Sequence, residues 1–207
     1  SLSLNRAVCE KIRKINVRTM IAGVDEVGRG PLAGPVLAVA VILKPKGIEG
    51  LRDSKKLTEK KRIELCKIIR NDAKAWAYGI ASVKEIDEMN ILNASLLAMK
   101  RAVLHLPLQP HRVLVDGNRC PDIAIPSQAI IGGDNSVPEI SAASIVAKVI
   151  RDYLMTVFDK HYPQYGFAKH KGYGTQDHLR AIDDFGVSPI HRRSFSPVSN
   201  ALLREIG

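Results

Sequence analysis

An unbroken run of apolar residues from Val36 to Leu43 constrains the fold of this chain more than any other feature. The run is rich in valine and lies between Pro35 and Lys44. A strand with one wet face alternates apolar and polar residues, whereas a continuous β-branched run is typical of a strand covered on both faces. Since the run is also too short to cross a bilayer as a helix, we expect a sheet with helices on both sides.

The remaining periodicity supplies the other elements of such a sheet. Apolar and alternating stretches predict further strands over residues 19–25, 73–82, 112–116 and 128–131. Helical spacing and a good N-cap at Thr58 predict helices over residues 2–15, 58–70, 90–105, 138–161 and 176–185, and one from Ser199. This order predicts a three-layer α/β fold. We expect one main domain over residues 1–185 and a short basic, helical C-terminal segment over residues 186–207 that packs on it.

The chain carries a large excess of positive charge. Its 31 Lys and Arg residues outnumber 21 Asp and Glu residues, which gives a formal net charge of +10 and a pI of about 9.7. Such an excess favours a nucleic acid as partner, because each neutralised phosphate releases condensed counterions. A merely solubilising surface on a small-molecule enzyme is the alternative.

Three cysteines, Cys9, Cys66 and Cys120, form no close pair. This spacing excludes a zinc ribbon and argues against a disulfide framework. The N-terminus lacks the apolar core of a signal peptide, and no apolar run is long enough to span a membrane. We therefore expect a cytoplasmic protein with no membrane partner. With no long heptad or large apolar stripe, we also expect a monomer.

Acidic residues stand at the ends of three expected strands: Asp25 with Glu26, then Asp116, then Asp134. Ligands of open α/β sheets gather outside strand ends. Carboxylates collected there repel one another unless a cation joins them, and oxygen donors favour Mg²⁺ or Mn²⁺. Two such ions can activate a water and stabilise the leaving oxygen in phosphodiester hydrolysis. The pattern therefore predicts a metal-dependent catalytic site.

Adjacent residues of a regular strand point to opposite faces of the sheet. Asp25 and Glu26 can face the same ions only if the chain bends at this pair, and we expect such a bend, which Gly28 and Gly30 permit. Each acid taken singly also fits an ordinary turn or cap. Their joint position at strand ends favours the metal site.

The motif Gly28-Arg29-Gly30 follows the acidic pair directly. Glycines let the backbone approach a ligand and offer open N–H groups to phosphate oxygens, and a guanidinium can hold a phosphate with two bonds. The motif alone usually marks a turn, and it is not a dinucleotide fingerprint, because position 33 is Ala. Its place after the acids favours phosphate binding.

The expected helix over residues 138–161 is apolar almost all round. Its polar residues Ser141, Ser144, Lys148 and Arg151 fall on one stripe. Two interpretations have equal weight: the stripe is the only wet face of a core helix, or it borders the cleft that holds the acids.

Read together, these motifs resemble the ribonuclease HII family. The stretch from Ile21 to Val36, IAGVDEVGRGPLAGPV, is similar to the opening signature of that family. Further matches follow in family order and extend the resemblance over residues 21–195: Asp53–Leu57, Val115–Asn118, Gly133–Asp134, Ile140–Val149, Arg151–Asp152, Lys171–Thr175 and His191–Phe195. A series of this length is far more specific than any single motif.

The resemblance implies an RNase H-like fold, with a central mixed β-sheet flanked by helices. It implies an endonuclease that hydrolyses the RNA strand of RNA–DNA hybrids and cuts 5′ of single ribonucleotides embedded in duplex DNA. The expected products carry 3′-hydroxyl and 5′-phosphate ends. The family's four catalytic, metal-binding carboxylates correspond to Asp25, Glu26, Asp116 and Asp134, which are expected to hold two Mg²⁺ or Mn²⁺ ions.

The same resemblance suggests the residues that bind substrate. Gly28, Arg29 and Gly30 are expected to contact the ribonucleotide and its phosphates. Tyr173 is similar to the family's junction-sensing tyrosine, although a tyrosine between two glycines also suits a turn anchor. The other expected substrate contacts are Lys55, Ser144, Lys148, Lys171 and Arg192. Asp152, a rival acid, fits an internal ion pair better.

Three other functions compete with this one. Another nuclease or strand-transferase on the same fold would share the acids but would not need the Gly-Arg-Gly motif together with Tyr173. A non-catalytic nucleic-acid binder would use the basic surface alone. A metal-dependent small-molecule phosphatase is disfavoured by the net charge of +10.

Overall fold

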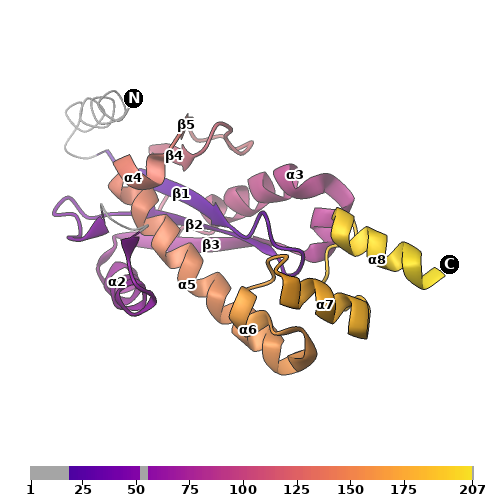
Figure 1. Ribbon diagram of the computed structural model, residues 1–207. Helices are drawn as coiled ribbons and strands as arrows, with labels where there is room; N and C mark the ends of the chain where they lie inside the picture. The colour runs from indigo at the N-terminus through magenta and orange to yellow at the C-terminus, as the bar shows by residue number, and fades with distance from the viewer. Residues whose placement is uncertain (1–18, 52–55, 207) are drawn as a thin grey trace. The chain divides into compact units, whose positions relative to one another are not determined.

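The structure, a computed structural model, describes residues 19–51 and 56–206 (Figure 1). The helix expected over residues 2–15 and the expected substrate contact Lys55 lie outside the described residues. Two compact units make up the described part of the chain. We call residues 19–27, 37–80 and 96–149 the sheet unit, and residues 28–36, 81–95 and 150–206 the C-terminal unit.

A five-stranded mixed sheet forms the centre of the sheet unit (Figure 1). The strands are β1 (Ile21–Val27), β2 (Val36–Ile42), β3 (Ala75–Ala81), β4 (Arg112–Asp116) and β5 (Ser127–Ile130). Their order is β3-β2-β1-β4-β5, with β1 antiparallel to β2 and parallel to β4, and β4 parallel to β5. Every residue of β2 is buried, which confirms the strand covered on both faces.

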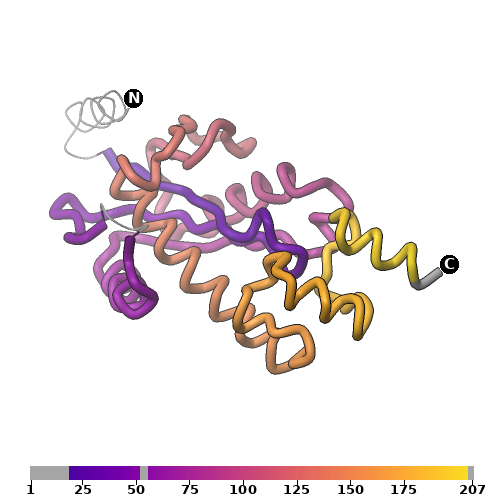
Figure 2. The backbone as a smooth tube through the Cα atoms, in the orientation of Figure 1, coloured from indigo at the N-terminus to yellow at the C-terminus, as the bar shows by residue number. Residues whose placement is uncertain are grey.

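Helices account for most of the remaining chain, whose path can be followed in Figure 2. They are α2 (Glu59–Asp72), α3 (Val83–Leu104), α4 (Gly133–Ser136), α5 (Pro138–His161), η2 (Pro163–Tyr165), α6 (Phe167–His170), α7 (Gln176–Phe185) and α8 (Ser196–Ile206). The N-cap at Thr58 is confirmed, because its side chain accepts the N–H of Lys61. Among the described residues, no helix is long and apolar enough to span a membrane.

Glycines in two strands let helices pack directly on the sheet backbone. A Cβ added at Gly23 of β1 would lie 2.1 Å from the carbonyl carbon of Glu139 in α5. A Cβ at Gly79 of β3 would lie 2.2 Å from the carbonyl oxygen of Ala98 in α3. Only residues without a Cβ permit these approaches. They fix the first half of α5 against β1, which carries Asp25 and Glu26, and the second half of α3 against β3.

Two apolar clusters organise the C-terminal unit. One gathers Ala33, Met155, Tyr165, Phe167, Ala181 and Ile190, and the other gathers Leu32, Ile182, Val198 and Ala201. Each contains one residue of the loop that follows Gly28, so that loop is anchored by core packing at two successive positions. The division of the chain at residue 185 stays a prediction.

The expected bend at Asp25 and Glu26 is wrong. Strand β1 keeps a regular antiparallel register with β2 through this pair and on to Val27, which lies opposite Leu37. The turn comes later, at Gly28, whose φ of +93° belongs to the left-handed region that favours glycine. Pairing with β2 therefore overrides the bend that the metal hypothesis requires at the acids.

The helix expected from Asn90 starts earlier than predicted. Helix α3 begins at Val83 and is kinked at Asn90, whose φ is 72°. The side chain of Asn90 accepts the N–H of Asn93, so this residue caps the second part of α3, as its place in the sequence indicates. The part of α3 before Asn90 could not be predicted, because it is too short to show helical periodicity in the sequence.

Candidate active site

Four acids of the sheet unit lie near the carboxyl ends of the parallel strands β1 and β4. The pairing between β1 and β4 ends at Val24 opposite Val115, so Asp25 and Asp116 each come directly after the last residue that joins these two strands. Asp134 lies in α4, and its N–H donates to Oδ1 of Asp116 over 3.2 Å. We call Asp25, Glu26, Asp116 and Asp134 the acidic cluster.

Asp25 is the most constrained member of the acidic cluster. Its side chain is only 7% exposed and accepts the N–H of Glu26 over 2.8 Å. Burial raises the pKa of this carboxyl well above its usual range, and repulsion from Glu26 and Asp116 raises it further, against the hydrogen bond from Ser144. Burial and like charges together disfavour the ionised form, which is the electrostatic setting that a bound cation reverses.

Asp134 is held in place by contacts from α4 and from the first turn of α5. Asn135 of α4 donates to its carboxylate over 3.2 Å, and the single hydroxyl proton of Ser141 in α5 is shared between the main-chain carbonyls of Asp134 and, over 2.8 Å, Leu51. The polar stripe of α5 is therefore divided: Ser144 interacts with Asp25, whereas Ser141 has a purely structural role. The stripe is not the wet face of the helix, because Ser141 and Arg151 are buried, whereas the contact of Ser144 with Asp25 fits the interpretation that the stripe borders the acids.

The donor chemistry of the acidic cluster fits a hard divalent cation, since every candidate ligand is a carboxylate oxygen. The acids meet through pairwise contacts: within the described ranges, no group of three or more His, Cys, Asp or Glu side chains forms a ready-made metal centre. Their regular register also separates Asp25 and Glu26 along β1. The metal-ligand roles therefore stay a proposal, and the support for Glu26 is the weakest.

The Gly-Arg-Gly motif begins the C-terminal unit. A Cβ at Gly28 would lie 2.2 Å from Nε of Arg151, so this position accepts only glycine. The guanidinium of Arg192 donates to the carbonyls of Gly28, Arg29 and Gly34 over 2.5, 2.9 and 2.9 Å. Arg29 itself and Gly30 are exposed. The motif thus presents a backbone held by Arg192 and an exposed arginine side chain at the surface.

Arg151 and Arg192 are buried inside the C-terminal unit. Arg151 donates to the carbonyls of Ala33, Pro35 and Lys171 over 2.9 to 3.1 Å. Burial lowers the pKa of Arg151 to about 10 and that of Arg192 to about 9, so both stay charged at neutral pH. Arg192 is fully buried, so a role in holding the loop fits it better than the expected phosphate contact.

Tyr173 lies beside the Gly-Arg-Gly motif. A Cβ at Gly30 would lie 3.5 Å from Cε1 of the tyrosine ring, and the ring is 43% exposed. The preceding Gly172 admits no side chain, because a Cβ there would lie 2.7 Å from the carbonyl of Ala33. The structure therefore brings together Gly28, Arg29, Gly30 and Tyr173 as the sequence predicts, with Lys171 next to them in the chain.

Comparison with known protein families matches residues 22–198 to Ribonuclease HII. The chain belongs to the ribonuclease HII family. It is 59% identical over 184 residues to Ribonuclease HII of Vibrio parahaemolyticus, covering 88% of this chain and 87% of that protein. It is also 59% identical over 185 residues to Ribonuclease HII of Coxiella burnetii, covering 89% and 92%.

Solved structures agree on the fold. Ribonuclease H2 from Pyrococcus horikoshii superposes with a TM-score of 0.76 at 27% identity, over 90% of this chain and 98% of that one. Bst-RNase HIII in complex with Mn²⁺ gives 0.69 at 17% identity, over 90% and 70% of the chains, and supports the fold alone. The RNase H-like mixed sheet flanked by helices is thus confirmed. The protein is a ribonuclease H, which cleaves the RNA strand of RNA–DNA hybrids.

Sequence reasoning missed two groups in this ribonuclease HII. Arg151 was taken as one member of a polar stripe, although a lone arginine on an almost wholly apolar helix signals a buried partner. The mutual contacts of His170, His178 and His191 in the C-terminal unit could not be predicted, although His191 lies in one of the family matches, because single histidines far apart in the sequence carry no spacing signal.

Proposed function

We propose that this ribonuclease HII also cuts 5′ of single ribonucleotides embedded in duplex DNA, by two-metal-ion hydrolysis that leaves 3′-hydroxyl and 5′-phosphate ends. The observation that carries the proposal is the environment of Asp25, a buried carboxylate beside two further acids. Buried like charges are costly unless a cation joins them, and phosphodiester hydrolysis is the chemistry that such ions supply.

The four residues of the acidic cluster are the proposed ligands of two Mg²⁺ or Mn²⁺ ions. Bound there, the ions would activate a water molecule and stabilise the departing 3′-oxygen. Asp25, Asp116 and Asp134 are supported by their mutual contacts. Glu26 lies beyond the last residue of β1 that pairs with β4. Its longer side chain would therefore have to extend past the end of this pairing to reach the same ions.

Recognition of the ribonucleotide is assigned to the C-terminal unit. The N–H groups of Gly28 and Gly30 and the fork of Arg29 would bind the phosphates and the 2′-hydroxyl, which alone distinguishes a ribonucleotide from its DNA neighbours. The ring of Tyr173 would pack on the adjacent sugar. Ser144, Lys148 and Lys171 remain secondary candidates. A monomer acting in the cytoplasm fits this proposal and stays part of it.

Three duplexes test the proposal: a continuous RNA–DNA hybrid, a DNA duplex with one ribonucleotide, and the same duplex without it. We expect Mg²⁺-dependent cleavage of the first two, lost on chelation and restored by Mg²⁺ or Mn²⁺. Cleavage of the all-DNA duplex, or cleavage that survives chelation, would contradict it.

The substitution Tyr173→Ala tests the proposed role of Tyr173 in recognising the embedded ribonucleotide. Loss of one stacking contact should slow cleavage at the single ribonucleotide about tenfold and affect the continuous hybrid much less. Tyr153→Ala is the matched control, because Tyr153 is a 70% exposed tyrosine of the same unit. Equal losses on both substrates would remove the junction-sensing role of Tyr173.

A further inference from the structure

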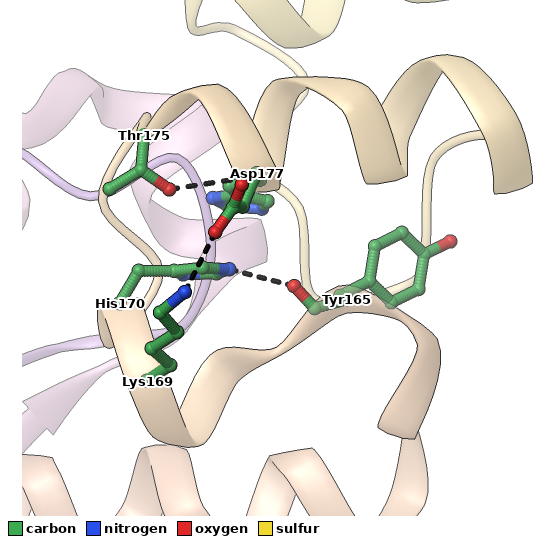
Figure 3. A network of polar contacts seen from close by, with 6 residues as sticks. Tyr165, Lys169, His170, Thr175 and Asp177 are labelled. Carbon is green, nitrogen blue, oxygen red and sulfur yellow. Dashed lines mark hydrogen bonds and ion pairs between the residues drawn. The ribbon is translucent and has the colours of Figure 1, made fainter.

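Three histidines distant in sequence lie against one another behind Tyr173. The rings of His170 and His178 stack with centroids 4.3 Å apart and planes 11° apart. Nε2 of His178 lies 2.9 Å from Nε2 of His191. All three side chains are buried, and Figure 3 shows His170 directed at the carbonyl of Tyr165 beside Thr175 and Asp177. A direct contact between two imidazoles in a core is unusual, because apolar residues would fill the same space without polar atoms.

The contacts at the two ends of this chain fix the position of every proton. The N–H of Ser188 can only donate, and it points at Nδ1 of His191 over 2.9 Å. A neutral His191 must then carry its proton on Nε2 and donate it to His178. The carbonyl of Tyr173 can only accept, and it lies 2.8 Å from Nδ1 of His178. Both ends therefore require the same direction of hydrogen-bond donation: Ser188 donates to His191, His191 donates to His178, and His178 donates to Tyr173. We call this chain of hydrogen bonds the relay.

The relay works only with neutral rings, because an imidazolium has no acceptor atom. Burial lowers the pKa of His178 to about 4 and that of His191 to about 3. The neighbouring His178 lowers the pKa of His191 further, and His170 lowers the pKa values of both His178 and His191. Other polar groups near the histidines include the Ser188 hydroxyl, 2.7 Å from Nδ1 of His191, the Tyr165 ring against His191, and the exposed ion pair of Lys169 with Asp177. The relay is therefore intact at neutral pH.

His170 holds the chain that leads into Tyr173, because its main-chain carbonyl accepts the N–H of Tyr173 over 3.0 Å. Its Nδ1 accepts the N–H of Gly172 over 3.1 Å, and its Nε2 donates to the carbonyl of Tyr165 over 2.7 Å. The carbonyl before Tyr173, that of Gly172, accepts the N–H of Leu32 over 2.8 Å. Both peptide groups flanking Tyr173 are thus held, which fixes the point from which its side chain leaves the main chain, and the ring lies beside Gly30.

We propose that His178 and His191 are positioning residues for Tyr173, and that their hydrogen-bond relay sets the preference of the enzyme for a single embedded ribonucleotide over a continuous hybrid. The inference rests on the role proposed above for Tyr173. Neither histidine touches substrate; each acts through the main chain of the tyrosine. Preorganisation of this kind affects the substrate whose recognition depends on the ring and spares the substrate that offers other contacts.

Two substitutions at His191 separate positioning from packing. His191→Asn places an amide oxygen near the position of Nδ1, which keeps the bond from Ser188 but removes the donor to His178. His191→Gln places an amide N–H near the position of Nε2 and keeps that donor. We expect His191→Asn to lower the ratio of single-ribonucleotide to hybrid cleavage two- to tenfold, the effect of about one hydrogen bond. His191→Gln should retain the ratio within about twofold.

His161→Asn is the control, since His161 is exposed and bonds only to the carbonyl of Val157 in its own helix among the contacts that the structure describes. Equal losses on both duplexes with both His191 variants would show a structural role and overturn the relay. If Tyr173→Ala left the ratio unchanged, the proposed role of the tyrosine would fail instead. A ratio changed by Tyr173→Ala but not by His191→Asn would reject the relay alone.

Nitrogen chemical shifts of the imidazole rings in the wild-type protein test the relay even if a variant fails to fold. At pH 7 we expect His191 protonated on Nε2 and His178 protonated on Nδ1, each as a single neutral tautomer. A proton on Nε2 of His178, or a mixture of tautomers at either ring, would contradict the direction of the relay.

Discussion

The two units of this enzyme bury charge in opposite ways. In the sheet unit, the carboxylates of Glu26 and Asp116 lie near that of Asp25, and burial and charge repulsion oppose the ionisation of Asp25. In the C-terminal unit, the buried guanidiniums of Arg151 and Arg192 each donate to three main-chain carbonyls. The first arrangement is destabilising until a ligand arrives, whereas the second is complete in itself.

This difference separates two kinds of site. A cluster of like charges is stabilised when a cation binds, which is the setting proposed for the catalytic site. A loop whose carbonyls are held by buried arginines is preorganised, which suits the recognition of a fixed shape. The chemistry and the recognition of substrate are therefore expected to fail independently when each unit is changed.

The largest effect is expected from Asp116→Asn in the sheet unit. Replacing a proposed metal ligand should lower the single-turnover cleavage rate about 10³-fold or more, on every substrate, with duplex affinity nearly unchanged. Asp122→Asn, an exposed acid of the same unit, should have no effect. Near-normal turnover of Asp116→Asn would exclude this acid from the catalytic site.

Next in size is Arg192→Lys in the C-terminal unit. A lysine cannot reproduce the fork that bonds to three carbonyls, so the free energy of unfolding should fall by about 3 kcal/mol. Chemical denaturation measures it, with the exposed Arg193→Lys as control. Because Arg192 is buried, the salt dependence of duplex binding should stay the same. A shallower salt dependence would restore its expected phosphate contact.

Acid should destabilise the C-terminal unit through its histidines. The unfolded chain binds protons at His178 and His191 below about pH 6.5, whereas the folded protein resists protonation until about pH 4 and 3. Stability is therefore complete above pH 6.5 and declines as the pH falls toward 4. Between pH 7 and 5.5 the loss should be about 1 kcal/mol per histidine. His191→Asn should make this decline shallower, and an unchanged slope would contradict the shifted pKa.

The smallest effect is a gain of stability from Asp25→Asn. The raised pKa of Asp25 means that folding opposes its ionisation, so its contribution falls as the pH rises above the unfolded value near 4. A neutral amide should therefore raise the free energy of unfolding at pH 7 in a chelator. Mg²⁺ should stabilise the wild type but not the variant. A lower free energy of unfolding for Asp25→Asn than for the wild type in the chelator would contradict the repulsion inferred within the acidic cluster.

The same contrast explains what the sequence could predict. Strand β2 and helix α5 follow from their composition, because a continuous apolar run and a long amphipathic pattern have few other solutions. The acids follow from their places at strand ends. The bend at Asp25 and Glu26 was wrong, since strand pairing is a tertiary effect that the local sequence does not encode.

The contacts that hold the loop following Gly28 could not be predicted for a related reason. Arg192 bonds to carbonyls more than 150 positions earlier in the chain, and His191 meets His178 only after α7 has folded back. Main-chain carbonyls have no sequence signature, so an arginine that binds them resembles one that binds phosphate until its burial is known.

The division of labour is tested most directly by comparing Asp116→Asn and Tyr173→Ala on the same two duplexes, the continuous hybrid and the single-ribonucleotide DNA, in single-turnover assays with saturating Mg²⁺. The account predicts that Asp116→Asn loses cleavage of both duplexes in equal proportion, whereas Tyr173→Ala loses mainly cleavage at the single ribonucleotide. The same pattern of loss in both variants would contradict it.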